Sequence, residues 1–236
     1  MLRYVLLLVM LVSACGLSPR GSGFITAEQW NPSTPELQQK ASDFRQVSRA
    51  VSVAATDTCR RQAKNLNCEF GILVDPDPNA EVNAFQTLDD KKRPYIIFTQ
   101  TMIESTQNAD EMAFVMGHEA AHHVLDHIAR QAKNSQESAQ IFGNLARDYG
   151  ADDEGVELAQ KLGADVGVQV YIKGFELEAD RLGTVITHSA GYDPLVGMEY
   201  FKRIPDPGDR FLATHPPNAQ RVQAVLETAA QLGLTQ

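Results

Sequence analysis

The feature that most constrains this chain is a predicted helix over residues 109–128, which carries the pattern His-Glu-x-x-His at residues 118–122. Asn108 is a suitable N-cap for this helix, and Glu111 stands at the third helical position, which is a capping-box arrangement. Apolar side chains recur at helical spacing, as they do on a face that packs against a core: Met112, Val115 and Met116.

The spacing within this pattern indicates a metal site. His118 and His122 are four positions apart, so on a helix they lie about 40° apart around the axis and about 6 Å apart along it. Two imidazole nitrogens at this spacing can bind one zinc ion at about 2.0–2.1 Å. Glu119 is rotated by about 100° from His118, beside a metal rather than on it, where it could take a proton from an activated water. The alternative is a solvated helix face with incidental histidines.

A hydrolytic zinc site needs a third protein ligand and one open position. In the metzincin pattern a Gly and a His would follow His122, but Leu125 and Ile128 stand at those positions. That pattern is therefore absent. We interpret His123 as a surface or packing histidine, and His127 as a structural residue rather than a ligand.

A later predicted helix over residues 168–190 offers carboxylates instead. Glu176 and Asp180 are four positions apart, so they share one helical face. Glu176 could complete a His-His-Glu site, and Asp180 could accept the spare ring N–H of a ligand histidine and so set its tautomer. An acidic solvated face is the alternative, and the residues alone leave both interpretations open.

The first residues predict a signal peptide over 1–14. Arg3 supplies the positive charge, and the apolar run that follows is too short to cross a bilayer as a permanent helix. Val-Ser-Ala-Cys15 resembles a bacterial lipobox, in which the cysteine becomes lipidated. Gly16 then implies sorting to the outer membrane, if the source is Gram-negative. The alternative is an ordinary secretory signal with a buried cysteine.

Composition bounds the remainder of the chain. Residues 16–35 are rich in Gly, Ser and Pro, which predicts a flexible tether after Cys15 and a single domain over 36–236. Without residues 1–14 the chain holds 20 basic and 30 acidic residues, a formal charge of −10. An acidic chain without Lys/Arg clusters argues against a nucleic-acid partner.

Cys59 and Cys68 form an even pair once Cys15 is assigned to lipid. In an oxidising periplasm a disulfide that closes this short loop is the favoured interpretation. Two separate buried thiols are the alternative.

The pattern of elements predicts an α+β fold that is mostly helical. A helix begins at Pro35, and three strand-like segments follow: 70–75, 81–85 and 95–99. We expect them to form a small antiparallel three-stranded sheet next to the motif helix. The third strand could be an edge strand that aligns a peptide substrate, or it could only cover the core.

Residues 134–165 are harder to interpret. Residues 134–137 can cap a helix, and residues 150–154 indicate a break before another. The segment could be a lid over the site or a packing element.

The linked motifs resemble a known family. His-Glu-x-x-His followed by Glu-x-x-Ala-Asp on a later helix is similar to the zinc metallopeptidases of the CAAX prenyl protease and HtpX type. Further motifs extend the resemblance over about residues 36–230: Asn83-Ala84-Phe85, Gly191-Tyr192-Asp193-Pro194, and Thr214-His215-Pro216 with Arg221 behind it. The signal, lipobox and cysteine pair are similar to the periplasmic lipoprotein members of this family.

The resemblance implies roles for individual residues. It implies that His118, His122 and Glu176 bind one zinc ion per chain and that Glu119 is the general base and acid. Asp180 would support a ligand histidine from behind, with Arg221 nearby, and His215 would either close the resting site as a fourth ligand or stabilise the oxyanion.

One departure stands four and three residues before Glu176. Many members of the family have Ser-Arg there, whereas this chain has Ile172 and Lys173. Lysine keeps the charge but not the bidentate fork of arginine, so the local contact is in doubt while the metal site is not.

The resulting expectation is a lipid-anchored periplasmic zinc endopeptidase that acts in quality control of envelope or outer-membrane proteins. Its partners would be unfolded or misassembled envelope polypeptides, and the membrane through Cys15. One alternative is a zinc-containing binding or assembly factor with little proteolysis, against which the intact Glu119 argues. Another is a zinc hydrolase of a non-peptide bond, such as a cell-wall amide.

Overall fold

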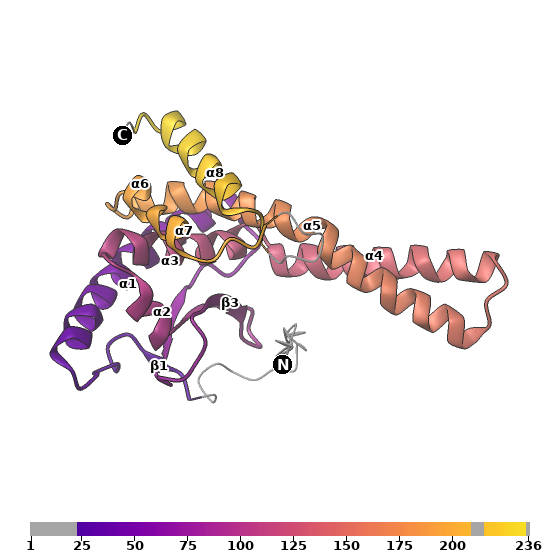
Figure 1. Cartoon of the computed structure of the whole chain (residues 1–236), viewed down its shortest axis with the longest axis horizontal. Coiled ribbons are helices and arrows are strands. Elements are labelled where there is room, and N and C mark those ends of the chain that lie inside the picture. The colour runs from indigo at the N-terminus through magenta and orange to yellow at the C-terminus, as the bar shows by residue number, and fades with distance from the viewer. Residues whose placement is uncertain (1–22, 209–214, 235–236) are drawn as a thin grey trace, which may run out of the picture.

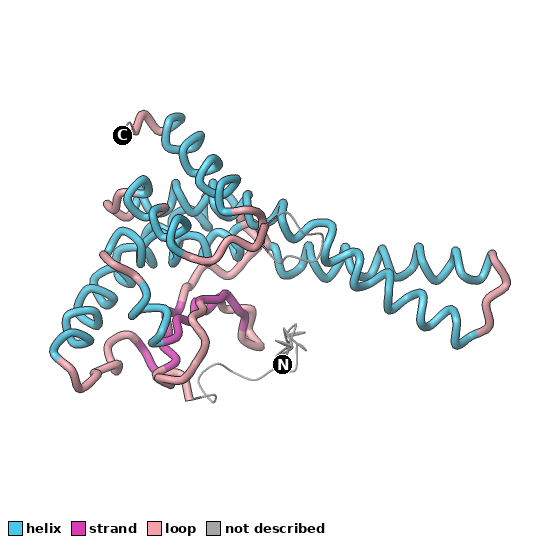
Figure 2. Tube along the Cα trace, viewed as in Figure 1, coloured by secondary structure: helices cyan, strands magenta, loops and turns pink. Residues whose placement is uncertain are grey.

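A computed structural model describes residues 23–208 and 215–234, and Figures 1 and 2 show its α+β architecture. The predicted signal peptide, Cys15 and Thr214 lie outside the described residues. In chain order the elements are β1 (Ile25–Thr26), α1 (Pro35–Gln62), β2 (Gly71–Asp75), β3 (Ala84–Leu88), β4 (Pro94–Thr99), α2 (Gln100–Ser105), α3 (Ala109–Val124), α4 (His127–Asp148), α5 (Asp153–Ser189), α6 (Pro194–Gly197), α7 (Glu199–Arg203) and α8 (Asn218–Gln231). In the described part of the chain, none of these helices combines the length and the apolar character needed to cross a bilayer.

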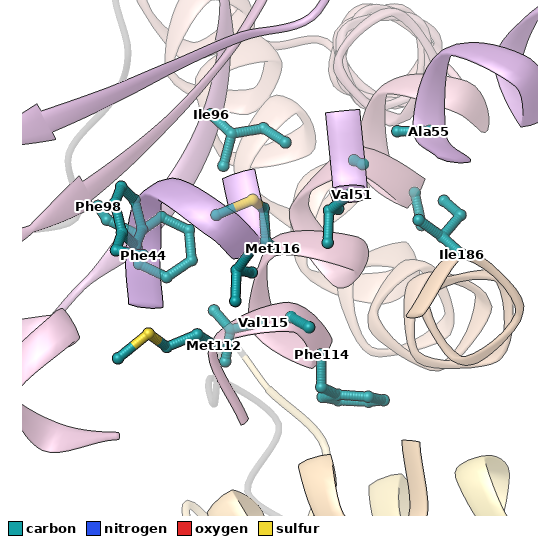
Figure 3. Packing of buried hydrophobic residues seen from close by; sticks show 14 of the residues in the cluster. Phe44, Val51, Ala55, Ile96, Phe98, Met112, Phe114, Val115, Met116 and Ile186 are labelled. Atoms are coloured by element: carbon teal, nitrogen blue, oxygen red, sulfur yellow. The ribbon is translucent and has the colours of Figure 1, made fainter. Parts of the chain in front are cut away.

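The core lies between α1, α3 and the sheet. Thr34 caps α1, and the apolar positions that recur along this helix are buried: Ala41, Phe44, Val47, Val51 and Ala54. They pack with side chains of α3 and β4, as Figure 3 shows for Phe44, Phe98 and Met116. The Phe44 and Phe98 rings meet edge to face with centroids 5.2 Å apart. The motif helix α3 is therefore a core element. The face that it packs against the core is the one that its apolar spacing predicted.

The sheet differs from the prediction. It has four strands in the order β1-β2-β4-β3, and β2 runs parallel to β4, so the sheet is mixed rather than antiparallel. β4, the expected edge strand, is central and all six of its residues are buried. β3 lies at the edge instead and begins at Ala84, three residues after the predicted start. An apolar run such as β4 suits a central strand because both of its faces are covered.

Residues 25–30 lie on the domain, although their composition predicted a tether. β1 pairs antiparallel with β2. Trp30 is only 2% exposed and packs edge to face on Phe44. A single large aromatic side chain buries enough apolar surface to hold a short polar segment in place, which outweighs the composition of its neighbours.

The predicted helix over residues 109–128 is in fact two helices. α3 ends at Val124 and α4 begins at His127, with Asp126 between them in the left-handed conformation at φ 54°. Asn108 caps α3 as predicted, by accepting from the Glu111 N–H at 2.9 Å. The Glu111 carboxylate accepts from the Gln107 N–H instead of completing the capping box at Asn108.

α4 and the first part of α5 form a helical hairpin that projects from the body (Figure 1). α4 runs through residues 134–137 without interruption, so the predicted cap there is wrong, whereas the break at 150–154 is confirmed by Asp152 as the N-cap of α5. The two helices pack closely through small residues: a Cβ on Gly167 would lie 2.5 Å from the Asn134 carbonyl oxygen. The hairpin is thus a closely packed pair of helices.

The predicted disulfide is present. Cys59 at the end of α1 is bonded to Cys68, and the two Cα atoms are 5.7 Å apart. The bond joins α1 to the segment that leads into β2.

α3 and α5 cross at a pair of glycines. A Cβ on Gly183 would lie 2.9 Å from both the N and the Cα of His118, and a Cβ on Gly117 would lie 3.0 Å from the Gly183 carbonyl oxygen. Only a residue without a side chain fits such an approach of two backbones. This crossing brings the His-Glu-x-x-His turn of α3 onto α5.

We expect Gly183→Ala to lower the free energy of unfolding by about 1–3 kcal/mol, because the new methyl group must push α5 away from α3. Gly174→Ala is the matched control on the same helix, since open space surrounds Gly174. It should leave the free energy of unfolding unchanged or raise it by up to about 1 kcal/mol. Denaturant titration of both variants measures the difference, and equal effects would show that the crossing tolerates a side chain.

Candidate metal centre

Four elements bring the predicted site residues together. α3 carries His118, Glu119 and His122, and α5 carries Glu176 and Asp180. His215 comes from the segment before α8, and Arg221 from α8 itself. The close crossing of α3 and α5 is what places the histidines of one helix against the carboxylates of the other.

Three side chains converge on one point. The Nε2 atoms of His118 and His122 are 3.0 Å apart. One Glu176 oxygen is 3.5 Å from His118 Nε2, and the other is 3.3 Å from His122 Nε2. These three residues form a group that could hold a metal ion.

The donor set fits zinc. Two donors that each lie 2.0–2.1 Å from a tetrahedral zinc ion are about 3.3 Å from one another. The His118–His122 separation of 3.0 Å and the distances of 3.5 and 3.3 Å from these histidines to the two different oxygens of Glu176 are close to that value. Two neutral imidazoles and one carboxylate are also the ligand types found in catalytic zinc sites.

Asp180 and Arg221 support His118 from behind. Asp180 is fully buried, and its Oδ1 lies 2.9 Å from His118 Nδ1. Arg221 donates two hydrogen bonds to Asp180, Nε to Oδ2 at 2.8 Å and Nη2 to Oδ1 at 2.7 Å. Burial alone would raise the pKa of Asp180, but the Arg221 guanidinium holds this pKa below its ordinary value. A charged Asp180 therefore accepts the His118 N–H and leaves Nε2 directed at the ligand cluster.

The carboxylates keep His118 charged when no metal is bound. Burial lowers the pKa of His118, but hydrogen bonds to Asp180 and Glu176 outweigh burial and raise this pKa to about 10. In the same way the three histidines around Glu176 hold its pKa well below the ordinary range against the effect of burial. A proton and a metal ion compete for the same imidazole nitrogen, so this environment provides the negative charge that a divalent cation needs.

Glu119 has the electrostatics of an acid–base residue. Burial raises the pKa of its carboxyl group, and the neighbouring His118 and His122 oppose that rise. A carboxyl group whose pKa is raised is better suited both to accept and to return a proton.

His215 lies on Glu176. Its Nδ1 is 2.6 Å from Glu176 Oε2, and its side chain is 52% exposed. The histidine thus joins the buried Glu176 to the exposed surface.

His127 was interpreted as a structural residue, and the metal-ligand group does not include it, but its contact with His122 was not foreseen. The predicted helix continued to residue 128, whereas the break at Asp126 turns His127 back, and its Nδ1 lies 2.8 Å from His122 Nδ1. Burial is the main cause that lowers the pKa of His127 to about 4, and the positive charge of His122 is the second. The spacing His-x4-His at residues 122–127 was the only signal in the sequence. His123, by contrast, packs edge to face on Phe70 away from the cluster, as expected of a packing histidine.

A helix with His-Glu-x-x-His, a glutamate from a later helix and an α+β body together define a metallopeptidase of the zinc-dependent class. The chain belongs to peptidase family M48, because the model of that family matches residues 41–229. This membership makes the chain a metalloprotease and confirms the resemblance carried by the motifs.

The similar curated proteins are much longer than this chain. The chain is 30% identical to the putative beta-barrel assembly-enhancing protease of Vibrio cholerae over 182 residues, which are 72% of the chain and 36% of that protein. It is 25% identical to the beta-barrel assembly-enhancing protease of Yersinia pestis over 167 residues, 65% of the chain and 34% of that protein. The chain thus spans about a third of the length of these relatives.

We expect Arg221→Met to lower the free energy of unfolding by about 3–5 kcal/mol, because it leaves the Asp180 carboxylate buried without its guanidinium. The measurement is denaturant unfolding in the presence of a chelator, so that metal binding does not contribute. Arg49→Met is the matched control, since Arg49 pairs with Glu28 at 3.9 Å with both side chains exposed. It should cost less than about 1 kcal/mol, and an equal cost for both variants would contradict the role of the buried pair.

Proposed function

We propose that this chain is a lipid-anchored periplasmic zinc endopeptidase. The observation that carries the proposal is the convergence of His118, His122 and Glu176 on one point, with Glu119 beside them on the same helix turn. The predicted signal peptide and Cys15 support the location, and the disulfide between Cys59 and Cys68 is compatible with an oxidising compartment.

The residues divide the chemistry among them. His118, His122 and Glu176 would hold the zinc ion, which when bound supplies a Lewis acid for the scissile carbonyl and lowers the pKa of water. Glu119 takes a proton from the attacking water at its carboxylate and returns it to the leaving nitrogen. Asp180, held by Arg221, keeps the proton of His118 on Nδ1, so that Nε2 is free to bind the metal.

The edge of the sheet is suited to hold the substrate. β3 pairs with β4 on one side only within the described sheet, and it lies against α3. A polypeptide in extended conformation can add to such an edge through main-chain hydrogen bonds, which do not depend on the identity of its side chains. We therefore infer that the enzyme accepts unfolded segments rather than folded proteins.

The names of the relatives support a substrate class. Two are named for the enhancement of beta-barrel assembly, which supports unfolded or misassembled envelope polypeptides as substrates here. Because the chain matches only about a third of each relative, the proposal concerns the peptidase domain.

We expect the purified protein to bind one zinc ion per chain and to cleave casein, with Glu119→Gln retaining the metal but losing cleavage by at least about 100-fold. Metal content by atomic absorption and the rate of casein cleavage are the measurements. The control is Glu157→Gln, an exposed position on the projecting hairpin, which should leave metal content and cleavage rate unchanged.

Other outcomes would favour the alternative functions. Zinc binding without cleavage of any unfolded protein would favour a binding or assembly factor. The same factor would be indicated if cells with Glu119→Gln assembled their envelope normally while cells without the protein did not. Release of fragments from purified cell wall, with no cleavage of casein, would favour an amidase.

We expect His215→Ala to increase the basal rate of casein cleavage several-fold. His215 contacts Glu176 at 2.6 Å from an exposed position, and in the proposed enzyme it must leave before a substrate carbonyl can approach. The measurement is the steady-state rate at saturating casein with zinc content held equal. A fall in kcat at unchanged zinc content would show instead that His215 stabilises the oxyanion.

A further inference from the structure

His127 is buried at the start of α4 with both ring nitrogens engaged. Its Nδ1 lies 2.8 Å from His122 Nδ1, and its Nε2 lies 3.3 Å from Glu178 Oε2. His127 is 4% exposed, so water does not replace these contacts. A polar ring in such a position is held by its partners.

Two further contacts clamp the ring. His127 stacks on Phe175 with centroids 4.5 Å apart and planes inclined by 15°. Arg130 donates to both oxygens of Glu178, at 2.6 and 3.2 Å, and its guanidinium lies 4.4 Å over the same Phe175 ring. The carboxylate that faces His127 is therefore fixed and charged.

The chemistry of these groups assigns the protons. Glu178 can only accept, so the proton of a neutral His127 lies on Nε2 and its Nδ1 carries a lone pair. A hydrogen bond between two nitrogens needs one donor, so His122 must donate from Nδ1. The proton that His122 keeps is then on Nδ1, so Nε2, which faces Glu176 Oε1 at 3.3 Å, is the nitrogen available to a metal ion.

We propose that His127 is a positioning residue that, with Glu178 and Arg130, sets the tautomer and orientation of His122 for zinc binding. The inference rests on the proposed function, because it takes His122 as a zinc ligand. It assigns the two ligand histidines different supports. His118 is supported directly by Asp180, whereas His122 is supported through a second imidazole. The left-handed break at Asp126 is what turns that imidazole back onto His122.

The test compares two replacements of His127 in the full chain. His127→Phe keeps an aromatic ring on Phe175 but removes the acceptor. His127→Asn removes the ring but places an amide oxygen where Nδ1 stood. We expect His127→Phe to weaken zinc binding by about 10–100-fold, as loss of a hydrogen-bond partner behind a ligand histidine does. His127→Asn should stay within a few-fold of the wild type.

Two measurements other than activity report on metal binding. Zinc affinity is measured by competition with a chelator, and the visible absorption of the Co²⁺-loaded protein reports ligand number and geometry. His127→Phe should change the cobalt spectrum, and His127→Asn should preserve it. The inference is overturned if His127→Phe binds zinc and cobalt like the wild type, or if His127→Asn loses as much affinity as His127→Phe.

Glu178→Leu keeps the inference testable if His127→Phe does not fold. Glu178 is 41% exposed on its side chain, so the change is tolerable at the surface, and it removes the acceptor that assigns the His127 proton. Zinc affinity should fall several-fold, and an unchanged affinity would overturn the inference. A wild type that binds zinc but cleaves nothing refutes only the proposed function, whereas a wild type that binds no zinc refutes both.

Discussion

The structure depends on the close crossing of α3 and α5. Zinc donors have to converge to about 3.3 Å from one another, and side chains from two helices reach such distances only if the backbones approach closely. Gly117 and Gly183 permit that approach, since a Cβ on either would meet the other helix at 3.0 Å or less. The ligand cluster is thus a property of helix packing. Its two histidines and its glutamate arrive together only because two small residues meet at one point.

Once the helices cross, the buried charges are balanced within the site. Asp180 is compensated by Arg221, and Glu176 by the histidines around it. An unpaired charge at such depth would cost several kcal/mol, on the order of the total stability of a domain. The same groups that would bind and support a metal therefore also allow the metal-free fold to exist, with protons in place of the cation.

The region that defines the family contains the whole candidate site. Membership of peptidase family M48 rests on residues 41–229, and the ligand cluster, the edge strand and Glu119 all lie within that range. The hairpin of α4 and α5 projects from the body of the molecule (Figure 1). Its first residue, His127, contacts His122 at the site. The region shared with the relatives is only about a third of their length, so what they add lies beyond the matched region.

The sequence by itself determined what depends on neighbours along the chain. It predicted the start of α1 at Pro35, the cap at Asn108 and the pairing of His118 with His122, because these follow from residues close together in the chain. Glu176 and Asp180 were singled out by their spacing, but only the motif resemblance favoured them over an acidic solvated face, and His215 and Arg221 were reached only through that resemblance. Strand order, the ordered position of Trp30 and the return of His127 onto His122 were decided by tertiary structure. Each depends on contacts between residues far apart in the chain, or on one left-handed residue whose effect on direction no periodicity reveals.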